Sequence, residues 1–146
     1  MFMATRSILL FSFVLVVLLS GCKKDKDNQV PLTTVDINVN VNLPEYNALA
    51  VTGGWVYLTG GVEGLIVYRN SPDEFTAMDR LCTYHTEDLC RVYVDDSQVI
   101  ARDTLSSGFC GSAFLILDGS VTQGPASLGL KVYHTTFNGT TLHIFN

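Results

Sequence analysis

The sequence has 146 residues, the length of one ordinary domain, with 47% hydrophobic residues and a formal net charge of −5. Lysine and arginine form no cluster beyond a short stretch near residue 24, which argues against nucleic acid and anionic membrane surfaces as partners. The hydrophobic residues are unevenly distributed, and their densest run lies close to the N-terminus.

That run spans residues 8–19, follows Arg6 and leads into Leu19-Ser20-Gly21-Cys22. It is much shorter than the about 20 residues that a spanning helix needs. It therefore predicts a secretory signal, although a short N-terminal membrane anchor is the alternative. The Leu-Ser-Gly-Cys sequence resembles the lipobox of bacterial lipoproteins. That resemblance implies a signal peptide at 1–21, acylation of Cys22, and a protein held by lipid at the bacterial cell envelope, outside the cytoplasm.

The residues after Cys22 are charged and contain no apolar side chain up to Gln29, so they cannot pack a core. We expect residues 22–34 to be a flexible tether and residues 35–146 to be a single domain. Removal of the signal peptide would take away Arg6 and no acidic residue, which leaves a net charge of −6.

Assigning Cys22 to the lipid leaves three cysteines in the domain, Cys82, Cys90 and Cys110. The envelope is oxidising, so a disulfide is permitted there. Because three is an odd number, at least one thiol stays free or binds something.

The domain itself has the pattern of an all-β protein. Apolar and polar residues alternate over Val35–Leu43, which indicates a strand with one buried face. Trp55 and Tyr57 are expected in the core. The hairpin signal Asn138-Gly139 predicts a type I′ turn. Further strands are expected at Gly54–Leu58, Leu65–Arg69, Phe75–Asp79, Arg91–Val94, Gln98–Arg102, Phe114–Ile116, Lys131–Thr136 and Thr141–Phe145.

Several short motifs follow one another in the second half of the domain. A predicted strand ends at Asp79 and leads to Cys82-Thr83-Tyr84-His85. The later motifs, in order, are Ser107-Gly108-Phe109-Cys110-Gly111-Ser112-Ala113-Phe114, Asp118-Gly119, Gly124-Pro125-Ala126, Leu130-Lys131-Val132-Tyr133 and the closing hairpin.

This order and spacing resembles the Rieske iron–sulfur family over about residues 35–146. The resemblance implies an all-β, Rieske-like sandwich that carries a smaller, loop-built subdomain. It also implies a [2Fe–2S] cluster held by two cysteines on one iron and two histidines on the other. The family's four ligand positions fall on Cys82, Tyr84, Ser107 and Cys110, of which only Cys82 has the family's residue type.

The family also has a disulfide between its two loops, whose positions fall near Cys90 and on Phe109. Ser112 matches a family serine that hydrogen-bonds a cluster sulfur. His134 and His143 lie on predicted strands far along the chain from the loops, so we expect them to be surface or core residues.

Three interpretations of the loops stay open. The cluster is absent and two of the three cysteines form a disulfide, with Cys110 paired to Cys82 or Cys90. A tetrahedral zinc site is built from Cys82, His85, Cys90 and Cys110. An unusually ligated [2Fe–2S] cluster is retained.

These interpretations lead to two functions. Ligand loss favours a non-catalytic binding or structural domain of the envelope. The alternative is an electron-transfer protein that passes electrons to a redox or envelope protein partner. No hydrolase or transferase motif competes.

Overall fold

The computed structural model describes residues 29–84, 86–103 and 110–146. The predicted signal peptide, Cys22 and most of the tether lie outside these residues, as do His85 and Ser107. Within the described ranges, no helix is long and apolar enough to cross a membrane.

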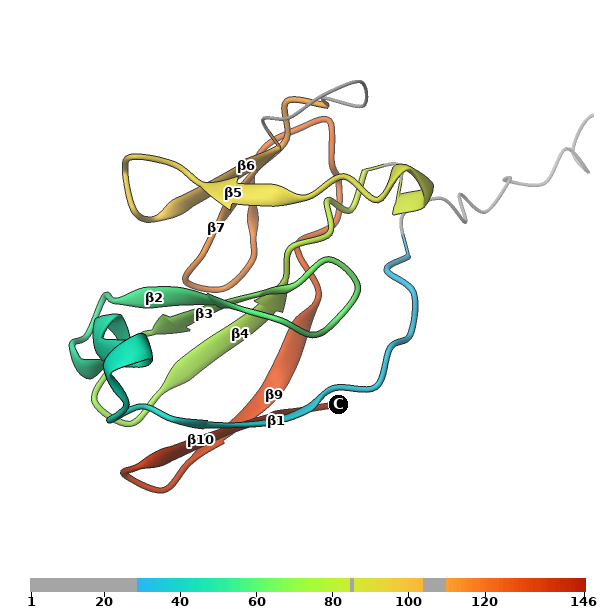
Figure 1. The fold of residues 1–146 in the computed structure, drawn as a ribbon. Helices are drawn as coiled ribbons and strands as arrows, with labels where there is room; N and C mark the ends of the chain where they lie inside the picture. Colours follow the sequence, from blue (N-terminus) through green and yellow to red (C-terminus); the bar gives the residue numbers. More distant parts are fainter. Residues whose placement is uncertain (1–28, 85, 104–109) are drawn as a thin grey trace, which may run out of the picture.

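The described residues form ten strands in two antiparallel sheets (Figure 1). The larger sheet has the order β1-β10-β9-β4-β3-β2, and its strands are β1 (Asp36–Asn40), β2 (Trp55–Leu58), β3 (Leu65–Arg69), β4 (Phe75–Asp79), β9 (Val132–Phe137) and β10 (Thr141–Phe145). The smaller sheet has the order β5-β6-β7-β8, made of β5 (Val92–Val94), β6 (Ile100–Asp103), β7 (Ala113–Leu115) and β8 (Val121–Gln123). Two short 3-10 helices are η1 (Pro44–Ala50) and η2 (Thr86–Asp88).

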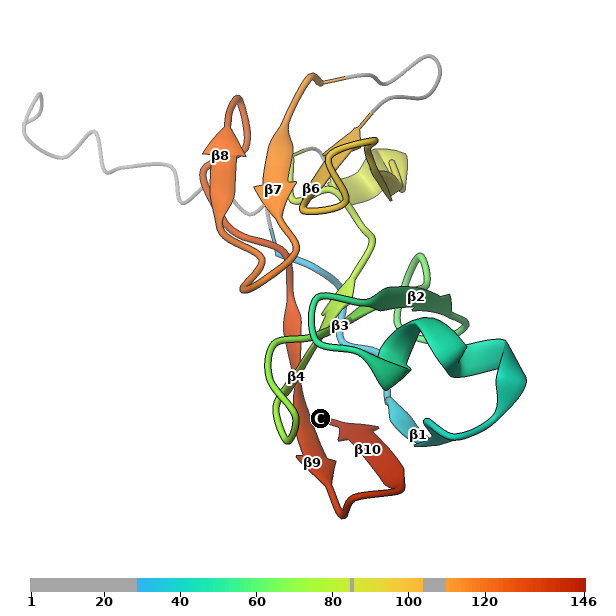
Figure 2. The same ribbon diagram turned by 90° about the vertical axis from the view of Figure 1, so that its left-hand side faces the viewer.

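The smaller sheet is an insertion between two paired strands of the larger one. The chain leaves the larger sheet after β4 and returns to it at β9, and these strands pair through Ala77–Tyr133 and Met78–Val132. Both views place β6 and β7 beyond one end of the larger sheet (Figures 1 and 2). The all-β class is therefore confirmed, together with its division into a larger body and a smaller subdomain.

Strand β3 separates two hydrophobic cores. Leu65 and Val67 pack into the core of the larger sheet, whereas Ile66 and Tyr68 pack into a second core shared with the subdomain. All four side chains are buried, which explains why this strand is a continuous apolar run and not an alternating one. The first core receives side chains from both edge strands, because the larger sheet curls around it.

Most predicted strands are present, with end shifts of one or two residues, but three details were wrong. The first strand stops at Asn40, and β8 was not predicted at all. The hairpin between β9 and β10 is present, yet only Gly139 in it has a positive φ, so its turn is not type I′. The Asn138 side-chain oxygen instead accepts from two following backbone N–H groups, which shapes a local turn.

Tyr57 is not a core residue. Its side chain is 37% exposed, and its hydroxyl accepts a hydrogen bond from the Val94 N–H at 2.8 Å, which links β2 to β5. Trp55 is half-buried, and its indole N–H donates to Gln98 at 3.0 Å. Tyr57 therefore links the two sheets at the surface, whereas Trp55 packs against the second core as expected and reaches Gln98 with its indole N–H.

Candidate functional site

The first cysteine-bearing loop begins at a carboxylate that is completely buried. Asp79, the last residue of β4, accepts hydrogen bonds from the backbone N–H groups of Val62 at 2.7 Å, Glu63 at 3.2 Å and Leu81 at 2.9 Å. The Tyr133 hydroxyl donates a fourth at 2.8 Å. The carboxylate thereby fixes the direction in which the chain leaves the larger sheet.

Arg80 follows and closes the junction between the sheets. Its guanidinium carbon lies 3.8 Å from the ring centre of Tyr57 and 4.6 Å from that of Tyr93. Its Nε donates to the Val92 carbonyl at 3.1 Å. These contacts pack β2 and β5 onto one side chain, so the subdomain is held against the larger sheet.

Backbone pairing then brings Cys82 into the interior. Leu81 forms a bridge with Arg91, and the Cys82 N–H donates to the Cys90 carbonyl at 2.8 Å. Cys82 is fully buried, whereas Cys90 and Cys110 are half-buried, and no disulfide joins any two of these three cysteines.

The second loop connects β6 to β7, and its two ends are held together by backbone and side-chain bonds. The Asp103 N–H donates to the Ser112 carbonyl at 3.1 Å. The Cys110 N–H donates to the Asp103 Oδ2 at 3.1 Å. Asp103 is 1% exposed, so its carboxylate faces the interior at the base of the loop.

The two loops meet at a buried group made of Cys82, Asp103 and Cys110. The ligand-capable atoms of these residues all lie within 4.8 Å of one another, and the two sulfurs are 3.3 Å apart. Asp103 Oδ1 is buried and has no hydrogen-bond partner within the described ranges. The arrangement offers two sulfurs and one oxygen from two loops.

Ser112 makes two hydrogen bonds with Cys110. The Cys110 thiol donates to the Ser112 Oγ at 3.0 Å, and its sulfur accepts from the Ser112 backbone N–H at 3.4 Å. The same hydroxyl oxygen accepts from the Ala126 N–H at 2.9 Å. Ser112 is fully buried, so it ties the sulfur to the segment that follows β8.

Burial raises the pKa of the Cys82 thiol to about 12, with smaller contributions from Cys110 and Asp103, while a backbone bond from Tyr84 acts in the opposite direction. Burial also raises the pKa of Cys90. A cation at the group would reverse this preference, because it would favour the thiolate forms.

Of the nominated ligands that lie within the described residues, the structure brings Cys82 and Cys110 together, whereas His85 and Ser107 lie outside those residues. Tyr84 packs against the second core, and Cys90 lies with its sulfur 4.0 Å from the Asp88 carbonyl. Asp103 was not predicted as a site residue. The predicted strand Gln98–Arg102 ended one residue before it, although an acid at the end of a strand that leads to a cysteine loop repeats the pattern of Asp79.

The residues present do not fit the ligand set of a Rieske cluster. The chain has three histidines, and His134 and His143 lie on β9 and β10 in the larger sheet. The His143 Nε2 is 2.8 Å from the Asp36 carboxylate, and His134 is 5.6 Å from the Phe145 ring centre. Only His85 remains in the loops, whereas the second iron of the cluster takes two histidines.

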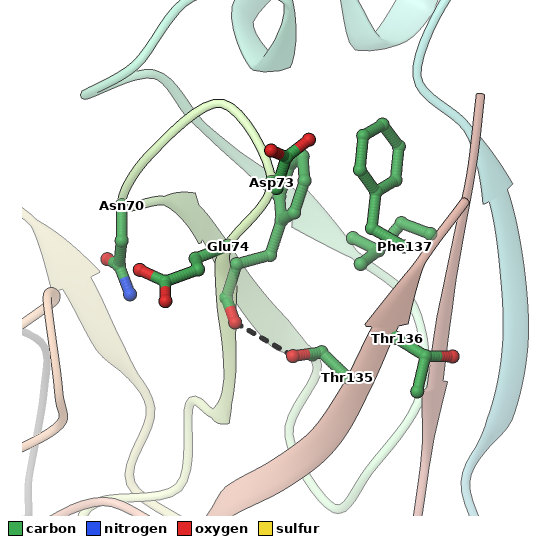
Figure 3. Close-up of a pocket in the computed structure, with 8 residues that line it drawn as sticks. Asn70, Asp73, Glu74, Thr135, Thr136 and Phe137 are labelled. Carbon is green, nitrogen blue, oxygen red and sulfur yellow. Dashed lines mark hydrogen bonds between the residues drawn. The ribbon is translucent and has the colours of Figure 1, made fainter. Parts of the chain in front are cut away.

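A separate pocket of about 420 Å³ lies between the β3–β4 turn and β9 (Figure 3). The Thr135 hydroxyl donates to the Phe75 carbonyl at 2.8 Å along one wall. Asp73 and Glu74 line it from the turn and are exposed to solvent. No cysteine or histidine lines this pocket.

Among known proteins, similarity is found to solved structures. No family model matches the sequence, and no curated protein matches it. Among solved structures, the chain is similar to one described as the small subunit of an NADH-dependent nitrite reductase from Mycobacterium tuberculosis, with 15% identity and a TM-score of 0.41. The match covers 79% of this chain and 97% of the other.

Proposed function

We propose that this chain is a lipid-anchored protein of the bacterial cell envelope. In this proposal a Rieske-like domain binds a ligand between its two cysteine-bearing loops and does not carry electrons through a [2Fe–2S] cluster. The observation that carries the proposal is the position of His134 and His143, which lie on β9 and β10 of the larger sheet. The loops cannot supply two imidazoles to one iron, so the redox chemistry of that cluster has no ligand set here.

The packing of the loops supports a binding role over a purely structural one. A buried carboxylate oxygen without a partner costs about 1–3 kcal/mol. Asp103 Oδ1 is such an atom, and it belongs to a carboxylate grouped with two sulfurs that an apolar core does not need. Buried polar atoms of this kind mark sites that bind an ion, a water or a ligand.

The anchor rests on the lipobox resemblance at Cys22. A tether over residues 22–34 would then keep the domain, residues 35–146, close to the membrane surface. Substitution of Cys22 by Ser tests this directly. We expect the wild-type chain to fractionate with membranes and to incorporate a labelled fatty acid, and Cys22→Ser to do neither. A Cys22→Ser chain that stays acylated would contradict the anchor.

The electron-transfer alternative is tested by supplying a cluster. The full chain is purified in detergent from cells with abundant iron and sulfide, and its visible spectrum and iron content are recorded beside a Rieske protein prepared in the same way. We expect a colourless chain without stoichiometric iron. A brown chain with about two irons would overturn the proposal in favour of electron transfer.

A further inference from the structure

We propose that Cys82, Cys110 and Asp103 together hold one zinc ion, with Asp103 as the third protein ligand. This inference rests on the proposed function, because it names the ligand that the two loops bind. It also replaces the four-ligand set of Cys82, His85, Cys90 and Cys110 that the sequence suggested.

The positions of the three side chains carry the first step. Their ligand-capable atoms lie within 4.8 Å of one another, and the two sulfurs are 3.3 Å apart. Two sulfurs bound at about 2.3 Å to one tetrahedral zinc are about 3.8 Å apart. A shift of roughly 0.5 Å therefore brings both sulfurs to binding positions. Cys110 is half-buried and has the greater freedom to make that shift, because Cys82 is completely buried.

Asp103 supplies an independent observation. Its Oδ2 is already held by the Cys110 N–H, which orients the carboxylate. Its Oδ1 is buried and has no hydrogen-bond partner in the part of the chain that the structure describes, and the same carboxylate contributes one oxygen to the group with the two sulfurs. A cation between the loops satisfies this oxygen and removes the cost of burying it alone.

The surroundings suit bound thiolates. The Cys110 sulfur accepts from the Ser112 backbone N–H at 3.4 Å, and the Ser112 hydroxyl, 3.0 Å away, can donate to it once the thiol has lost its proton. Donors of this kind tune ligand sulfurs in metal sites. Binding converts two thiols into two zinc–sulfur bonds and releases two protons to solvent, with no change of oxidation state.

The donor set selects the class of metal. Two sulfurs disfavour calcium and magnesium, which take oxygen ligands. Zinc accepts sulfur and carboxylate oxygen together, and Zn²⁺ does not change its oxidation state in an oxidising compartment. Three protein ligands leave one position for water or an external ligand, and Cys110 is only half-buried, so the site is accessible.

The test uses the full chain in detergent, kept reduced with a phosphine and equilibrated with Zn²⁺. After dialysis, we expect about one zinc per chain by mass spectrometry of the metal. We also expect Co²⁺ in place of zinc to show thiolate-to-metal charge-transfer absorption. Asp103→Asn keeps the size of the side chain and should weaken zinc binding by about 10-fold or more.

Two matched variants decide between ligand sets. Cys90→Ser should retain the zinc stoichiometry, and Asp118→Asn, an exposed acid in the β7–β8 turn, should retain the affinity. A wild-type chain that binds no zinc would overturn the zinc inference. The inference would also be overturned if Asp103→Asn bound zinc with unchanged affinity while Cys90→Ser lost it.

The failure of the zinc inference can be told from the failure of the proposed function. A colourless chain without zinc overturns only the zinc site, whereas a chain with stoichiometric iron overturns both the zinc site and the proposed function.

Discussion

The Asp79 carboxylate accepts a hydrogen bond from the Tyr133 hydroxyl at 2.8 Å, although the two residues are 54 positions apart in the chain. This bond joins the last residue of β4 to β9, at the point where the subdomain leaves the larger sheet. Both side chains are buried, and the same carboxylate holds the turn before β3. The geometry of the first cysteine loop therefore depends on this pair.

Tyr133→Phe should lower the free energy of unfolding by about 1–2 kcal/mol at neutral pH, because one hydrogen bond to a buried carboxylate is lost. Burial, followed by the Asp79 bond, raises the pKa of Tyr133 to about 12. The folded state then holds this proton more tightly than the unfolded state, whose tyrosine pKa is about 10.

The pH dependence follows from that difference. The stability that Tyr133 contributes is complete below pH of about 10 and is lost as the pH rises toward about 12. Urea unfolding of wild type and Tyr133→Phe across this range measures the difference between their free energies of unfolding. This difference should be constant at low pH and should shrink at high pH. A difference in unfolding free energy that grows with pH would contradict this account.

Gly61→Ala should destabilise the fold much more than Gly139→Ala. Both glycines have positive φ, so alanine strains the backbone by about 1–2 kcal/mol at either position. At Gly61 the added Cβ also runs into the Asp79 carboxylate and the Tyr133 hydroxyl, whereas nothing lies within 4 Å at Gly139. We expect Gly61→Ala to lower the free energy of unfolding by at least about 3 kcal/mol, as measured by thermal or urea unfolding. Equal losses would contradict the packing described.

Arg80→Lys should lower stability by about 1–3 kcal/mol, because an ammonium cannot stack between the Tyr57 and Tyr93 rings or keep the geometry of the bond to the Val92 carbonyl. Arg102→Lys is the matched control. That arginine forms an exposed ion pair with Asp95, worth about 0–1 kcal/mol. If the two substitutions cost the same, Arg80 does not join the two sheets as described.

Ser112→Ala should cost about 1–3 kcal/mol, since it leaves the buried Ala126 N–H without an acceptor. Ser127→Ala is the matched control: Ser127 is exposed, so its substitution should change the free energy of unfolding very little. Calorimetric or urea unfolding of both variants measures this difference. Unchanged stability of Ser112→Ala would mean that the Ala126 N–H finds another acceptor.

The strands of the domain were predictable because their cause is local. Alternation around Val39 places one face of β1 in the core, and the continuous apolar run at Leu65–Tyr68 matches a strand buried on both faces. The end of β6 was not predictable in the same way. Asp103 is polar and buried, so hydrophobic periodicity gives no reason to extend the strand to it.

The sequence by itself determined the all-β class and the hairpin at Asn138-Gly139, because periodicity and turn residues lie within short stretches of chain. Its resemblance to the Rieske family nominated Cys82 and Cys110 as ligand candidates, but it left open whether Cys110 lies beside Cys82 or Cys90. Only the tertiary structure decided that Asp103 joins the two cysteines. The physical reason is that convergence of side chains from two loops depends on the pairing of β4 with β9 and of β6 with β7. Those contacts are made between residues far apart in the chain.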